Sequence, residues 1–78
     1  MLAAATAAGG PAIPKAPTHV LIRAELLRVK PAADAPSSRE LPIGTQVRAV
    51  ELVGSWVIIA REGQKLGYVP TEALVRLQ

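Results

Sequence analysis

The chain has 78 residues, enough for one small domain, and its composition excludes several classes of protein. It contains no cysteine, which excludes a disulfide framework and any thiolate site, and no apolar run in it is long enough to span a membrane. The net charge of +3 comes from basic residues spread between acidic ones, so we expect no nucleic-acid binding. Half of the residues are hydrophobic, yet none is Phe, so the core must consist of Val, Leu, Ile and Ala, a composition that favours strands.

Residues 1–19 are predicted to form a flexible Ala- and Pro-rich tail or linker in front of the domain. Gly9-Gly10 and the prolines spaced three apart in Pro11–Pro17 stop any helix, and this proline spacing favours polyproline II. Two other interpretations stay open. The segment Ala5-Thr6-Ala7 has the small-x-small pattern of a cleavage site, as at the end of a truncated secretory signal. Alternatively, Pro11–Pro17 docks in an aromatic groove of the same chain or of a neighbouring copy.

The next segment alternates apolar and polar residues but changes phase once. We predict one strand at 20–24, a second at 27–30, and a bend or bulge at Glu25-Leu26, where the phase changes. Pro31–Pro42 contains three prolines and a pair of serines, which predicts a long loop. Long loops often carry function in compact domains, because their residues need not pack.

The second half of the chain predicts strands separated by short turns. The expected elements are strands 46–53, 56–61, 66–69 and 75–78, a hairpin turn at Glu62–Lys65 and one helical turn at Pro70–Leu74. The run Val57-Ile58-Ile59 is apolar throughout, which indicates a strand covered on both faces. With 20–24 and 27–30 taken as two pieces of one interrupted segment, these elements give about five short strands and predict an all-β fold, a small five-stranded barrel over residues 20–78 with no helix longer than one turn.

Four segments carry a recognisable pattern, and they follow one another at compatible spacings. They are Leu27-Arg28-Val29-Lys30, Leu41-Pro42-Ile43-Gly44-Thr45-Gln46-Val47, Gly54-Ser55-Trp56-Val57-Ile58-Ile59 and Gly67-Tyr68-Val69-Pro70. Together they resemble the bacterial form of the Src homology 3 domain family, over Val20 to Leu77. The resemblance implies a five-stranded Src homology 3-like barrel with one 3₁₀ turn, in which Pro31 to Leu41 form the long first loop.

The resemblance also implies a shallow binding groove, which eukaryotic members line with aromatic residues to hold polyproline ligands. Trp56 and Pro70 match positions of that groove, and Tyr68 lies beside them in the sequence. Other groove aromatics of the family are replaced here, by Leu27, Val29 and Pro31 in the region of the first strand and by Ala73 three residues after Pro70. Because a polyproline groove needs flat aromatic walls, these replacements argue against ordinary polyproline binding.

The remaining candidate binding residues come from the long loop and from surplus apolar positions. Asp34 and Glu40 in the loop could attract a basic ligand. Leu52 and Ile58 fall where an isolated barrel usually carries polar side chains, which suggests a surface that docks another domain or subunit. The sequence offers no catalytic set, and with His19 as its one histidine and no cysteine we expect no metal site and no cofactor.

These observations predict a non-catalytic binding module that docks a partner protein or peptide, as part of a larger bacterial protein or assembly. The alternative is a cell-wall-targeting module of an exported bacterial protein, with the groove holding a peptidoglycan peptide. An exported, periplasmic or cell-envelope location is favoured over the cytoplasm. Self-association through Pro11–Pro17 or through the face that bears Ile58 is a further expectation. The sequence does not specify the ligand.

Overall fold

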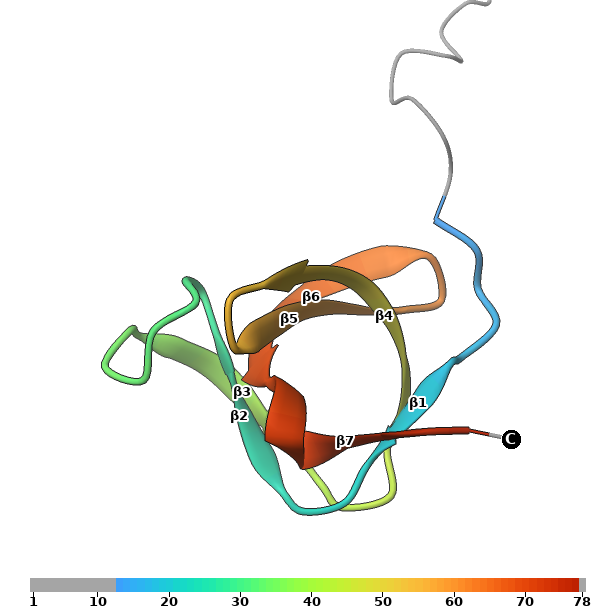
Figure 1. Cartoon of the computed structure of the whole chain (residues 1–78), viewed down its shortest axis with the longest axis horizontal. Coiled ribbons are helices and arrows are strands. Elements are labelled where there is room, and N and C mark those ends of the chain that lie inside the picture. The colour runs from blue at the N-terminus through green and yellow to red at the C-terminus, as the bar shows by residue number, and fades with distance from the viewer. Residues whose placement is uncertain (1–12, 78) are drawn as a thin grey trace, which may run out of the picture.

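Seven short strands and one 3₁₀ turn make up the part of the chain that the computed structural model describes, residues 13–77 (Figure 1). The elements in chain order are β1 (His19–Leu21), β2 (Glu25–Arg28), β3 (Ser37–Leu41), β4 (Gln46–Val53), β5 (Trp56–Arg61), β6 (Gln64–Pro70), the 3₁₀ turn η1 (Thr71–Ala73) and β7 (Leu74–Arg76). All strand pairs are antiparallel, in the order β3-β2-β6-β5-β4-β1-β7. None of the described elements is a helix long and apolar enough to cross a membrane.

The sheet curls around one apolar core (Figure 1). The buried residues of this core are Leu21, Leu27, Leu41, Val47, Val57, Ile59, Val69 and Ala73. As expected for a chain without Phe, all of them are aliphatic. The β-branched members lie on β4, β5 and β6, the three longest strands, where branched side chains pack well on a pleated surface.

The predicted all-β class is confirmed, but the five-stranded closed barrel is wrong in strand number and in closure. The sheet has seven strands, and its order ends at β3 on one side and at β7 on the other. One added strand comes from the interrupted first segment, which forms two separate strands, β1 and β2; the other is β3, which lies inside the segment predicted as a loop, Pro31–Pro42. Its first four residues are exposed and only Leu41 is buried, so the strand carries no apolar alternation that a sequence pattern could reveal.

The first strand is shorter than predicted, and the first two strands both lie nearer the N-terminus than predicted. β1 and β2 replace the expected strands 20–24 and 27–30. The chain bends at 22–23 and not at Glu25-Leu26, and the irregular register of the β2–β3 pair comes only after Leu27. β1 has apolar residues on both faces, so its sequence does not show which face packs on the core. The alternation pattern therefore predicts the bend at the wrong residues.

The loop between β2 and β3 is tied to the sheet at its base. The Arg28 guanidinium donates a hydrogen bond to the carbonyl oxygen of Ala35 at 2.9 Å, and Ala35 itself is buried. This bond joins a strand residue to the end of the loop. The tip at Ala33 and Asp34 therefore projects from an anchored base.

Contacts with the sheet begin before residue 20, the predicted start of the domain. The Thr18 N–H donates to the Val47 carbonyl at 2.9 Å, and the Arg48 guanidinium donates to the Ala16 carbonyl at 3.0 Å. The described contacts with the sheet thus reach back to residue 16, within the segment 1–19 that was predicted as a tail. The motif Ala5-Thr6-Ala7 and the rest of residues 1–12 lie outside the described residues.

The Thr18 hydroxyl gives a testable contribution to stability, because its Oγ1 accepts a hydrogen bond from the Ala49 N–H at 2.9 Å. We expect Thr18→Val to lower the free energy of unfolding by about 1 kcal/mol, since it keeps the side-chain shape but leaves a part-buried N–H without its partner. Thr18→Ser keeps the oxygen and should lose much less. Urea denaturation measures both, and equal losses for the two variants would contradict this role of the hydroxyl.

Candidate functional site

A hollow of about 280 Å³ lies where the start of β5 meets the end of β6. Trp56 and Pro70 are directly opposite each other across the β5–β6 pair, and both are half-buried. The hollow is lined by Ala33, Ser55, Trp56, Pro70, Thr71 and Glu72. It therefore joins the long loop, the β4–β5 turn and η1, three segments that are far apart in the sequence.

The local sequence holds the floor of this hollow in place. The turn before β5 uses Gly54 at φ +64°, a conformation that glycine adopts without strain. Pro70 has φ −65°, the value its ring imposes, and leads directly into η1. The Thr71 N–H then donates to the Ser55 carbonyl at 2.9 Å, which ties the turn to η1. The turn before Trp56 and the 3₁₀ turn after Pro70 thus fix the positions of these two side chains.

The predicted residues Tyr68 and Ile58 extend the same face of the sheet. They are opposite each other across β5 and β6, two residues along each strand from the Trp56–Pro70 pair. Directly opposed residues of an antiparallel pair project to the same face, and so do residues two apart. Neither side chain lines the hollow itself, and both are half-buried.

Leu52 lies apart from this face, although it was predicted to form one surface with Ile58. In the β4–β5 pair Leu52 is opposite Val57, a core residue, whereas Ile58 is opposite Glu51. Leu52 and Ile58 therefore lie on opposite faces of the sheet. Leu52 is 70% exposed and borders a second hollow of about 140 Å³, which is also lined by His19, Val57, Thr71, Leu74 and Arg76.

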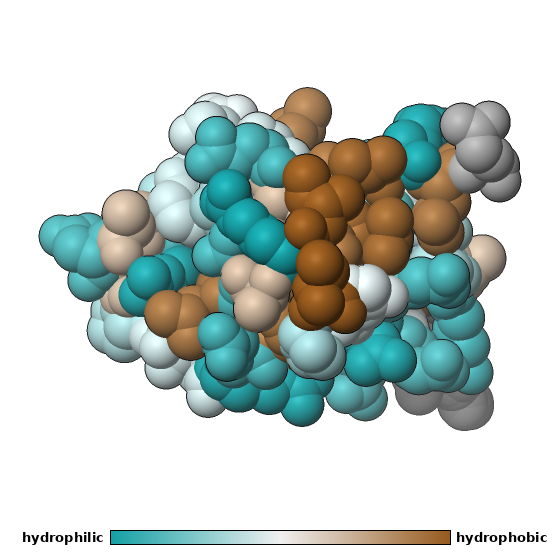
Figure 2. Space-filling view, turned by 90° about the horizontal axis from the view of Figure 1, so that it is seen from below, coloured by the Kyte–Doolittle hydropathy of each residue, from teal (hydrophilic) through white to brown (hydrophobic). Residues whose placement is uncertain are grey.

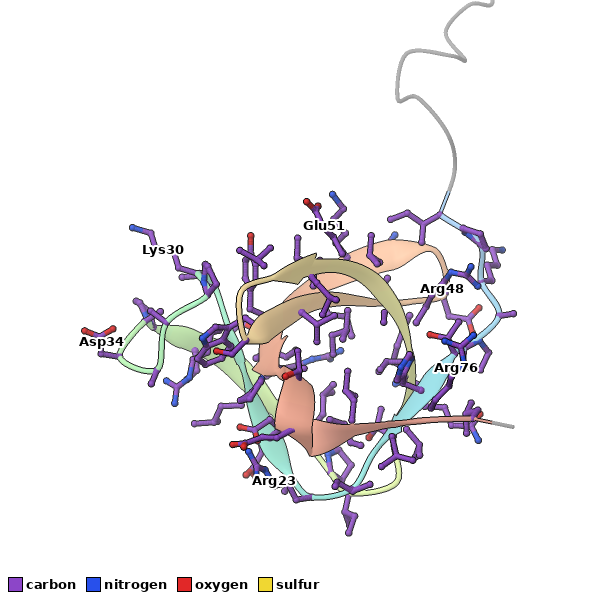
Figure 3. All side chains as sticks on the ribbon, viewed as in Figure 1. Arg23, Lys30, Asp34, Arg48, Glu51 and Arg76 are labelled. Carbon is purple, nitrogen blue, oxygen red and sulfur yellow. The ribbon has the colours of Figure 1, made fainter. Side chains whose placement is uncertain are left out.

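The two predicted acidic residues are not brought together at the hollow. Asp34 follows Ala33 at the loop tip and points away from the sheet (Figure 3). Glu40 is on β3, opposite Leu26, and does not line the hollow. The carboxylate that does line it, Glu72, was not predicted.

The charge of Glu72 is partly compensated. The Arg23 guanidinium bonds to Glu25 at 2.8 Å and to Glu72 at 3.3 Å, and these hydrogen bonds raise the pKa of Arg23. Both pairs are exposed to solvent, so each adds little to stability. As a result, the Glu72 carboxylate that lines the hollow is paired with the Arg23 guanidinium.

The sequence could have indicated only part of the lining of the hollow. Ser55 and Thr71 adjoin Trp56 and Pro70 in the sequence, whereas no sequence signal marks Ala33 or Glu72.

The proline-rich segment lies against a different part of the sheet. Its described residues line a third hollow, of about 170 Å³, together with residues of β4, β5 and the β5–β6 turn; the lining residues are Lys15, Pro17, Gln46, Val47, Arg48, Ala60, Arg61 and Glu62. None of the residues that line the Trp56 hollow belongs to this set. Within residues 13–77, the segment thus does not occupy the aromatic groove of its own chain.

His19 lies on β1 opposite Arg76 of β7, and its Nδ1 is 2.8 Å from the Thr18 Oγ1. Partial burial lowers the pKa of His19, and the positive charge of Arg76 lowers it further. The folded state therefore disfavours the protonated ring. Among residues 13–77, no three His, Asp or Glu side chains gather where they could hold a metal ion.

The lowered pKa of His19 gives the domain a pH-dependent stability. In the unfolded chain His19 binds its proton near its usual pKa of 6.5, at a pH where the folded chain still excludes it. Stability should therefore be constant above about pH 7 and fall as the pH drops below 6.5. Thermal melts between pH 7.5 and 5.5 measure this, because the chain has one histidine. In His19→Gln the stability should no longer change over this pH range. If its pH dependence equalled that of the wild type, another group would be the one that titrates.

Comparison with protein-family models, with curated proteins and with solved structures gives no match for this chain.

Proposed function

We propose that the chain is a non-catalytic binding module that holds a short segment of a partner protein or peptide in the Trp56 hollow. The observation that carries the proposal is the pairing of Trp56 with Pro70 beside a hollow of about 280 Å³. Tryptophan supplies a large contact area at low entropic cost, and it is enriched among residues that dominate binding energy. The resemblance of the sequence to bacterial Src homology 3 domains points to the same positions.

The lining favours an extended peptide with a small apolar side chain as the occupant. The Trp56 ring and Pro70 offer an apolar wall, and the hydroxyls of Ser55 and Thr71 offer hydrogen bonds at its edge. A hollow of this size is below the usual range for drug-sized ligands, so it holds a side chain or two rather than a whole small molecule. The adjoining half-buried pair of Ile58 and Tyr68 extends the contact surface for the rest of the peptide.

The experiment is a titration followed by the fluorescence of Trp56, the one tryptophan of the chain, and by amide NMR shifts. Two probes are used in parallel, an extended decapeptide that carries alanine and valine side chains and a soluble muropeptide with its stem peptide. Binding of either should shift the amides around 55–56 and 70–72, and the better probe decides between a protein partner and a cell-wall peptide. If neither probe shifts these amides at millimolar concentration, the proposed use of the hollow is wrong.

The Trp56→Ala variant should lose at least about tenfold in affinity for the better probe, which corresponds to 1.4 kcal/mol. The matched control is Val50→Ala, which removes an exposed apolar side chain from β4 outside the hollow. It should bind as the wild type does. Because Trp56 is half-buried, the fold of both variants is checked by amide dispersion before titration. Equal affinity in the two variants would place the binding surface elsewhere.

A further inference from the structure

The described sheet has two edge strands, and they differ in how well they are guarded against pairing with another strand. β3 carries Arg39 and Glu40 and lies between Pro36 and Pro42. Charged residues and prolines are the features by which natural proteins block an exposed edge. β7, at the other end, has the sequence Leu74-Val75-Arg76 with a single charged residue and is followed by Leu77; unlike β3, it has no proline beside it.

The pairing of β7 with β1 shows which backbone groups are free. The Ile22 N–H donates to the Ala73 carbonyl, and the Leu77 N–H donates to the Thr18 carbonyl. Hydrogen-bonded pairs alternate with non-bonded pairs in an antiparallel ladder, so the Val20–Val75 pair between these two is also hydrogen-bonded. The N–H and C=O groups of Leu74 and Arg76 consequently point away from β1, to the side where the sheet ends.

One of these outward groups already has a partner in the chain. The Leu74 N–H donates to the Thr71 carbonyl at the end of η1. The Leu74 carbonyl and the Arg76 N–H remain on the free side of β7, two residues apart, with Val75 between them. An antiparallel second copy presents the same two groups in the opposite order. The N–H of Arg76 in one copy can therefore face the carbonyl of Leu74 in the other, on both sides of Val75.

Apolar side chains lie along this edge on both faces of the sheet. On the outer face Val75, 48% exposed, is opposite Val20, and apolar side chains gather on the lower face of the molecule, where β1 and β7 lie (Figure 2). On the inner side Leu74 borders the hollow that also contains the strongly exposed Leu52. A strand added at this edge would lie beside apolar side chains on both faces of the sheet, so it would need apolar side chains on both of its own faces. β7 itself meets this requirement, because Leu74 projects to one face and Val75 to the other.

We propose that a second copy of this chain pairs with β7 antiparallel, about a two-fold axis between the two Val75 residues. Each Arg76 N–H then donates to the Leu74 carbonyl of the other copy, and Val75 meets Val75 in a non-bonded pair. Each Arg76 lies opposite a leucine of the other copy, so the pairing brings no two arginines directly opposite each other. The contact extends the seven-stranded sheet across two chains and covers the edge of the hollow that contains Leu52.

This dimer uses neither the Pro11–Pro17 segment nor the face of Ile58. None of the paired residues Leu74, Val75 and Arg76 lines the Trp56 hollow, so the two proposals can fail independently. A contact of two hydrogen bonds and a few side chains is smaller than a standard stable interface, so we expect a dissociation constant of about 0.1–1 mM. Sedimentation velocity of the full chain up to about 1 mM should show a reversible monomer–dimer equilibrium, and a strictly monomeric chain would overturn the proposal.

Single-cysteine variants test the register, because the chain has no cysteine of its own. Opposed residues of a non-bonded antiparallel pair have Cα atoms about 4.5 Å apart, within the range of a disulfide. Val75→Cys should therefore form a disulfide-linked dimer under mild oxidation at least about tenfold faster than Val29→Cys, whose side chain is similarly exposed but lies directly after β2. Equal rates for the two variants would overturn the register.

Two further variants test the contact itself. Val75→Lys puts two ammonium groups together at the axis and should abolish the dimer, whereas Val29→Lys, with the same charge change, should keep it. Arg76→Pro removes an N–H that β1 does not use, so it should leave a folded monomer, while Arg76→Ala keeps the N–H and the dimer. A dimer that survives Val75→Lys, or that is lost equally in both Arg76 variants while both stay folded, would count against the pairing.

Discussion

Ile59→Ala should lower the free energy of unfolding by about 2–5 kcal/mol, the range for truncating a buried aliphatic side chain. Ile59 is 0% exposed and lies in the middle of the sheet, opposite Ala49 on one side and Gly67 on the other. Both of these neighbours are small, so neither can fill the space that the substitution opens. A domain of about 60 residues has modest stability, so this loss should leave much of the chain unfolded at 37 °C.

Urea denaturation followed by Trp56 fluorescence measures the loss at Ile59. The matched control is Ile43→Ala, which removes the same side chain from a turn where it is 66% exposed. That variant should stay within about 0.5 kcal/mol of the wild type, as surface substitutions usually do. If the two variants lost the same amount, the core would not be centred on β5.

Gly67→Ala should cost about 2–3 kcal/mol, although it adds only one methyl group. A Cβ at this position would lie 2.9 Å from the carbonyl oxygen of Arg28 and 3.4 Å from the Cβ of Leu27. The nearest of these atoms is backbone, so it cannot turn aside as a flexible side chain would. Gly67 also has φ +153°, where an L-residue is strained. The methyl group would push β2 away from β6 at Arg28↔Tyr68, their one paired position.

The control for Gly67 is a glycine that has open space around it. A Cβ at Gly54, at φ +64°, would meet no atom within 4 Å, and Asn tolerates this left-handed conformation. Gly54→Asn should therefore lose well under half as much stability as Gly67→Ala. Amide shifts of β2 residues should move in Gly67→Ala and not in Gly54→Asn. A Gly67→Ala variant as stable as the wild type would mean that β2 and β6 are not in close contact there.

The parts of the fold that the sequence predicted are those with a strong burial pattern. β4 and β5 have the predicted bounds, and η1 falls within the predicted helical turn. β3 was missed for the opposite reason, since an edge strand with solvent on both faces has no apolar period. The order of strands around the sheet was also out of reach, because the pairing of β1 with both β4 and β7 depends on contacts between residues far apart in the chain.

The candidate site was predicted in part, and its main error could have been avoided. Trp56 and Pro70 were chosen from the motif, and the structure brings them together. Leu52 and Ile58 were grouped on one surface, yet the two-residue turn at Gly54-Ser55 places them on opposite faces. A hairpin turn of that length fixes the register, and the register decides which side chains share a face. Asp34 and Glu40 lie on the long loop and on β3, and sequence gives no means of orienting such residues.

The pairing of β1 with β7 has a consequence for how the domain can be built into a larger polypeptide. His19 and Arg76 are neighbours in the sheet, so the chain enters and leaves the domain at adjacent points. In Figure 1 this place lies across the molecule from the β4–β5 turn that precedes Trp56. A unit with adjacent ends can be spliced into a surface loop of a host protein without spreading that loop apart. Spliced in this way, the domain would display Trp56 and Pro70 on the side that faces away from its host.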